Sequence, residues 1–160
     1  MKEQKGLAQM ENDICITIRL MNYEDVREVA DIESETFSQP WPYDEFAKTV
    51  SDDNYKYIVA AAGNGVVGYA GAVCVQDEAD ITNVAVKKQF RNIGIAKELM
   101  KQLLILLKKN GIKEVFLEVR ESNDAAIALY KGYNFLSIDI RKNYYRLPTE
   151  NAIVMKRTLE

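Results

Sequence analysis

The stretch Arg91-Asn92-Ile93-Gly94-Ile95-Ala96 places one fixed positive charge beside small residues at close spacing. It follows the strand-like run 83–86 and opens a long helical pattern. Glycine lets the backbone approach a ligand closely, and the unpaired N–H groups at a helix start attract anions. The stretch therefore predicts a pyrophosphate site. The alternative is that Gly94 only eases the turn from strand to helix.

Several other chemistries are excluded by residue type. The loop is not a P-loop, because the Gly-Lys-Ser/Thr ending is absent, and a single glycine is too few for a dinucleotide fingerprint. The chain contains no histidine, which removes the Ser-His-Asp, Cys-His and HExxH arrangements. Any proton transfer must use Glu, Asp, Tyr, Lys, Cys or water.

Composition is typical of one globular domain. The chain has 160 residues, 48% hydrophobic and 28% charged, with a net charge of −3. This charge argues against a broad basic surface for nucleic acid. Cys15 and Cys74 stand in apolar runs, so neither a disulfide framework nor a metal site is expected, and a cytoplasmic location fits. No run approaches the ~18 apolar residues that span a membrane. We expect a flexible tail over 1–12 and one domain over 13–160.

Periodicity indicates a mixed order of strands and helices around this loop. Alternating apolar residues predict strands, whereas apolar residues three and four apart predict helices. A Gly63-Asn64-Gly65 hairpin turn separates two of the strands. The expected strands cover 14–20, 55–62, 66–75, 81–86, 113–119, 135–141 and 152–158, with a turn over 76–80, and the expected helices cover 23–37, 43–50, 95–109 and 124–133. This order predicts an α/β (α+β) domain.

A family resemblance emerges when separate runs are taken together. The runs are 83–86, 91–96, 117–120, 122–123, 126–130 and 141–145, together with Gln39-Pro40-Trp41. Jointly they resemble the GNAT acetyltransferase superfamily, and more narrowly the RimI-type ribosomal-protein N-terminal alanine acetyltransferases, over nearly all of 14–159. The resemblance implies a mixed, largely antiparallel sheet of about six to seven strands flanked by about four helices.

The resemblance also implies where acetyl-CoA binds. Backbone groups of the Val84-Ala85-Val86 segment would pair with the pantetheine arm as an added strand. The loop from Arg91 to Lys97 would hold the pyrophosphate, and Asn123 would hydrogen-bond the arm. A helix cap is the alternative role for Asn123, and the two roles are compatible.

The same resemblance assigns Glu118 as general base and Tyr130 as general acid. An N-terminal amine has a pKa of about 7.7–8.0, and a carboxylate can take its proton before attack on a thioester. A tyrosine with a pKa of about 10 stays protonated and can donate to the departing thiolate. The Val84 N–H is the candidate donor to the oxyanion, and we expect direct transfer without an acyl-enzyme. The alternatives are a solvated Glu118 and a core Tyr130.

The acceptor that the resemblance implies is a protein N-terminus, possibly of a small-subunit ribosomal protein. Two rival functions remain open: acetylation of a small-molecule amine, and a non-catalytic acyl-CoA sensor, which would not need both an acid and a base. Three departures from the family pattern are Asn134 for a glycine, Pro42 for Ser or Thr, and the altered segment 148–151. Asparagine tolerates a left-handed conformation, so we expect the turn at Asn134 to survive.

Overall fold

The computed structural model describes residues 6–9, 15–63 and 65–160. Within them, one mixed sheet has the order β1-β2-β3-β4-β5-β6-β8-β7. Its strands are β1 (Gly6–Gln9), β2 (Cys15–Leu20), β3 (Tyr55–Ala62), β4 (Gly65–Val75), β5 (Glu78–Val86), β6 (Glu114–Arg120), β7 (Leu136–Tyr145) and β8 (Glu150–Thr158). Only the β5–β6 pair is parallel. The predicted fold class is confirmed.

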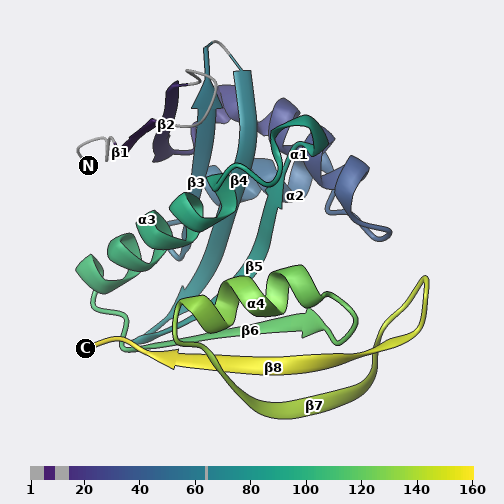
Figure 1. The fold of residues 1–160 in the computed structure, drawn as a ribbon. Coiled ribbons are helices and arrows are strands. Elements are labelled where there is room, and N and C mark those ends of the chain that lie inside the picture. The colour runs from purple at the N-terminus through teal and green to yellow at the C-terminus, as the bar shows by residue number, and fades with distance from the viewer. Residues whose placement is uncertain (1–5, 10–14, 64) are drawn as a thin grey trace.

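Helices cover both faces of this sheet (Figure 1). The helices are α1 (Val26–Thr36), α2 (Tyr43–Val50), α3 (Ile95–Lys109) and α4 (Asp124–Gly132), with short 3-10 helices at Tyr23–Asp25 and Lys88–Phe90. α1 and α2 share one buried cluster with Tyr57, Val59 and Tyr69. α3 packs its apolar stripe into the other cluster, which also holds Tyr130 of α4. In the described part of the chain, no helix has the length and apolar character needed to cross a bilayer.

Several element boundaries differ from the sequence prediction, and the largest differences concern four strands. β1 lies inside the predicted tail 1–12 and pairs with β2. The other residues of that tail lie outside the described ranges. β5 begins at Glu78, because the reversal is complete at Gln76 and Asp77, with Gln76 in a left-handed conformation of φ 56°. β7 runs on to Tyr145 instead of ending at 141, and β8 begins at Glu150 instead of 152. The turn at Asn134 adopts φ 64°, as expected for asparagine.

Glycines in β4 mark two irregularities of the sheet. Strand register shifts beside Gly68, opposite Ala60 and Ala61, and beside Gly71 in the pairing with β5. At Gly71 the ring of Tyr57 lies so close that an added Cβ would stand 2.2 Å from it. A side chain at this position would therefore displace Tyr57, whose hydroxyl reaches across to β5.

Candidate active site

A gap opens in the middle of the sheet where β5 and β6 part. The two strands pair over three residues only, Glu78 to Asp80 against Glu114 to Phe116. β5 then continues to Val86 and β6 to Arg120 without pairing to each other, and Figure 1 shows the two strands diverging. The carboxyl ends of these parallel strands are where open α/β sheets hold ligands.

The backbone of β5 turns hydrogen-bonding groups toward this gap. The Lys87 N–H donates to the Val67 carbonyl at 2.8 Å, which identifies an antiparallel hydrogen-bonded pair. Pairs alternate along an antiparallel ladder, so Ala85 turns its backbone groups toward β4. Val84 and Val86 turn theirs away from β4, into the gap. The structure thus brings Val84 and Val86 to the gap, while Ala85 is buried beneath α1 and α2.

The loop before α3 has the conformation that an anion site requires. Asn92 and Gly94 adopt left-handed conformations with φ of 64° and 91°. Gly94 is the N-cap of α3, and no side chain caps the helix, so its first N–H groups remain available. Arg91 braces the loop, because its Nε donates to the Val86 carbonyl at 2.9 Å.

The remaining loop residues anchor this turn. Ile95 is fully buried, and Ile93 and Ala96 pack against the same core. The Lys97 carbonyl accepts a 2.6 Å hydrogen bond from the Tyr133 hydroxyl. The loop is therefore held at the start of α3 from both the core side and the α4 side.

Glu118 lies on the α1–α2 side of the sheet. Val115, Leu117 and Val119 belong to the α3 cluster, so the alternating side chain of Glu118 points to the opposite face. This side chain is 26% exposed, and its Oε1 lies 3.7 Å from Nη2 of Arg141 on β7. It is neither fully solvated nor buried, and sequence reasoning missed its cationic partner.

Tyr130 approaches from the opposite face of the sheet, on α4. Its ring is 9% exposed and packs against Phe135 with centroids 5.9 Å apart. Burial raises the pKa of Tyr130 to about 12. In the described residues its hydroxyl makes no hydrogen bond, and no buried side-chain oxygen lacks a partner. The hydroxyl therefore reaches solvent.

Tyr145 of β7 lies near both of these groups. Burial raises its pKa, and the neighbouring Tyr144, Glu118 and Tyr130 raise it further, while Arg120 opposes them. The Arg120 guanidinium stands 4.5 Å over the Tyr145 ring. Glu118 and Tyr130 are thus both near Tyr145, from two faces of one sheet.

Asn123 caps α4, which was one of its two predicted roles. Its side-chain oxygen accepts a hydrogen bond from the Ala126 N–H at 3.2 Å. The helix consequently starts at Asp124, directly after the end of β6. This cap fixes the part of the chain that carries Tyr130.

The altered segment 148–151 is clamped to the end of β6. The Arg120 guanidinium donates to the carbonyls of Arg146 and Pro148 at 2.9 and 3.0 Å, and to Glu150 at 3.2 Å. Glu150 also accepts the Ser122 N–H at 2.6 Å, and these donors lower its pKa. The β7–β8 loop therefore has a fixed place two residues from Glu118.

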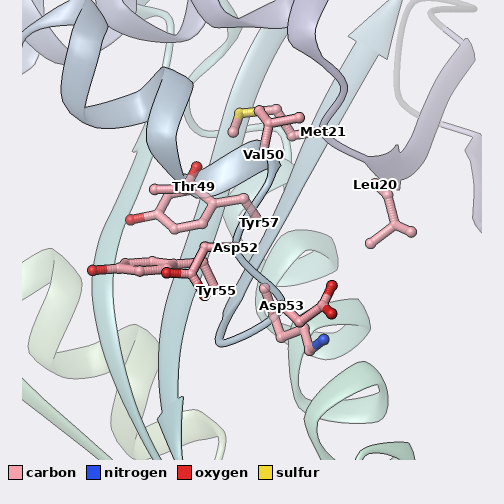
Figure 2. A pocket seen from close by; sticks show the side chains of 9 residues that line it. Leu20, Met21, Thr49, Val50, Asp52, Asp53, Tyr55 and Tyr57 are labelled. Carbon is pink, nitrogen blue, oxygen red and sulfur yellow. The ribbon is translucent and has the colours of Figure 1, made fainter.

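A separate hollow of about 210 Å³ lies where α2 ends and β3 begins (Figure 2). It contains none of the residues that the sequence assigned to the site. Its lining is Leu20, Met21, Thr49, Val50, Asp52, Asp53, Tyr55, Lys56 and Tyr57.

Known proteins are similar to this chain in sequence and in fold. The Acetyltransferase (GNAT) family matches residues 23–135. A Haemophilus influenzae [ribosomal protein bS18]-alanine N-acetyltransferase is 35% identical over 134 residues, covering 82% of this chain and 90% of that protein. The Escherichia coli (strain K12) protein of the same name is 34% identical over 143 residues, covering 87% and 95%.

Solved structures agree with the sequence matches. The crystal structure of the ribosomal-protein-S18-alanine N-acetyltransferase from Escherichia coli superposes with a TM-score of 0.84 at 31% identity, covering 91% of this chain and 94% of that one. Ard1 from Thermoplasma volcanium gives 0.83 at 28% identity, covering 91% and 98%. The chain belongs to the GNAT family of acetyltransferases.

Proposed function

We propose that this chain transfers an acetyl group from acetyl-CoA to the N-terminal α-amine of a protein, namely a ribosomal protein that begins with alanine. The relatives at 34–35% identity bear names that state this acceptor. A ribosomal acceptor places the reaction in the cytoplasm. The observation that carries the proposal is the gap between β5 and β6, because Glu118 and Tyr130 approach it from opposite faces of the sheet.

The residues around the gap fit acetyl-CoA. The uncapped start of α3 suits a pyrophosphate, and the outward backbone groups of Val84 and Val86 suit an extended amide-bearing arm. Bound there, acetyl-CoA supplies an acetyl group activated as a thioester. Arg91 adds a positive charge at the loop, and Asn123 stands at the start of α4 with its amide nitrogen available to the arm.

Glu118 is the general base in this proposal. An α-amine with a pKa of about 7.7–8.0 is partly protonated at neutral pH, and only the neutral amine attacks a carbonyl carbon. Glu118 takes the proton, directly or through one water, as the new C–N bond forms. Its position on the α1–α2 face means that the amine arrives from that side.

Tyr130 completes the transfer from the other side. As the C–S bond breaks, its hydroxyl gives a proton to the departing thiolate, while the Val84 N–H donates to the carbonyl oxygen as negative charge builds there. A pKa of about 12 keeps Tyr130 protonated throughout the neutral range. The acetyl group moves directly to nitrogen, so kinetics should show no ping-pong pattern.

The test uses acetyl-CoA and a hexapeptide that begins with alanine, with acetylation located by mass spectrometry. Modification at the α-amine, lost in Glu118→Gln, supports the proposal. Glu114→Gln is the matched control, since Glu114 lies on the same face of β6 but pairs with Lys156 at 3.0 Å. Equal activity in both variants removes the base assignment. Tight acetyl-CoA binding without peptide acetylation redirects the proposal to small amines, and binding without turnover on any amine favours a sensor.

A further inference from the structure

A buried carboxylate that the proposed chemistry does not use lies beneath the gap. Glu33 of α1 is 1% exposed. In the described ranges its partners are neutral donors, with no lysine or arginine among them. Burying a carboxylate is costly unless its oxygens accept hydrogen bonds, so these donors must hold their places.

The three donors come from three different parts of the fold. The backbone N–H of Trp41, in the loop between α1 and α2, donates to Oε2 at 3.1 Å. The Tyr69 hydroxyl of β4 donates to Oε1. The Asn83 amide of β5 donates to both oxygens, at 2.8 and 3.1 Å. One side chain therefore ties the α1–α2 loop to the strand that borders the gap.

Tyr57 connects Asn83 back to Trp41. Its hydroxyl donates to the Asn83 side-chain oxygen at 2.9 Å, so both ends of that amide are engaged. Its aromatic ring, labelled in Figure 2, has its centroid 6.5 Å from that of the Trp41 indole. Glu33, Trp41, Tyr57 and Asn83 thus form a closed circuit, which we call the Glu33 circuit.

The position of the Glu33 circuit gives it a role in catalysis. Asn83 immediately precedes Val84, whose N–H faces the gap. Trp41 lies on the α1–α2 side of the sheet, the side to which Glu118 points. The circuit consequently fixes the loop on the acceptor side against the strand on the cofactor side.

We propose that Glu33 is a positioning residue: through the backbone of Trp41 and the side chain of Asn83, it aligns the acceptor loop with the cofactor strand. Only the kinetic consequence of this inference rests on the proposed function. Misplacing a substrate by about 1 Å can cost about 100-fold in rate, so loss of the circuit should affect the peptide more than acetyl-CoA.

The chain provides its own probe, because Trp41 is its single tryptophan. In Glu33→Met the Trp41 N–H loses its acceptor. We expect acrylamide quenching of Trp41 fluorescence to at least double, and kcat/KM for the alanine peptide to fall about 10- to 100-fold. The Kd for acetyl-CoA should stay within about twofold, because the pyrophosphate loop is untouched.

Two further variants separate positioning from general stability. Glu33→Gln can keep a carbonyl toward Trp41 and Asn83 while its amide donates to Tyr69. Its Trp41 quenching and its kcat/KM for the alanine peptide should therefore be close to those of the wild type. Asp25→Asn removes a second buried carboxylate, bound to Arg19 at 2.6 Å, which stands at the N-terminal end of α1 and is not one of the residues of this circuit. It should lower stability while leaving Trp41 quenching unchanged.

One measurement needs no variant and holds even if Glu33→Met fails to fold. In the wild-type protein, NMR should show slower hydrogen exchange for the Trp41 amide than for that of Gln39 in the same loop. Equal exchange rates for the two amides overturn the proposal. So does a Glu33→Met variant whose Trp41 quenching is unchanged, or one that loses as much affinity for acetyl-CoA as kcat/KM for the peptide. If the wild type acetylates no peptide, the proposed function fails, while exchange and quenching still decide on the Glu33 circuit.

Discussion

Replacing Tyr130 by phenylalanine should separate catalysis from stability. The substitution removes one oxygen and keeps the ring that packs 5.9 Å from Phe135. Since no hydrogen bond in the described residues engages that hydroxyl, we expect the free energy of unfolding at pH 7 to change by no more than about 0.5 kcal/mol. Acetyl transfer should fall by about 10²- to 10⁴-fold, the usual contribution of a general acid.

The pH dependence provides a second, independent signature. Burial raises the pKa of Tyr130 from 10.0 to about 12. An unfolded chain therefore ionises this tyrosine first, and its contribution to stability is complete below pH 10 and lost as pH rises through 12. A difference of two in pKa corresponds to about 2.7 kcal/mol. Relative to wild type, Tyr130→Phe should gain up to roughly 2–3 kcal/mol between pH 10 and 12.

Urea unfolding at several pH values and single-turnover acetylation measure both effects. Tyr133→Phe is the control, because the Tyr133 hydroxyl donates to the Lys97 carbonyl at 2.6 Å. That variant should lose about 1 kcal/mol at pH 7. Strong destabilisation of Tyr130→Phe at pH 7 would mark a structural tyrosine. Full activity of this variant would exclude Tyr130 as the general acid.

Three further predictions concern other parts of the site. Gly71→Ala places a Cβ 2.2 Å from the Tyr57 ring, so denaturant unfolding should show a loss of about 1–3 kcal/mol. Gly94→Ala forces φ of 91° on a side chain, and calorimetry should show weaker acetyl-CoA binding with a stability cost of about 1–2 kcal/mol. The hydrogen bonds that lower the pKa of Glu150, from Ser122 first, contribute fully above its ordinary pKa and are lost as pH falls through the lowered pKa. NMR of the 146–149 loop should therefore show an acid transition that Glu150→Gln abolishes.

Local patterns accounted for most of the elements. The helix at Tyr43–Val50 and the strand at Tyr55–Ala62 match their predicted limits, because each is bounded by clear breakers and has a regular period. β7 was predicted too short, since the apolar alternation of Leu136, Ile138 and Ile140 does not continue through 142–145. Its extent depends on pairing with β8, a contact that no local pattern encodes.

Residue type also indicated the local conformation at two of the predicted site residues. Gly94 and Asn123 act through local turn and cap geometry, which residue type indicates directly. The Arg141 partner of Glu118 and the Asn83 partner of Glu33 come from distant strands and helices, the latter 50 residues away in sequence. Such pairs are set by sheet order and register, so the sequence alone did not predict them.

The arrangement of the gap explains why these long-range contacts matter. The proposed acid and base, Tyr130 and Glu118, both belong to the β6–α4 half of the sheet, whereas Val84 and the Gly94 loop belong to the β5–α3 half. Only three residue pairs join β5 to β6. The distance between catalytic groups and cofactor site therefore depends on what braces each half: the Glu33 circuit on one side, and Arg120 with Glu150 on the other. Weakening either brace should impair transfer without removing a reacting group.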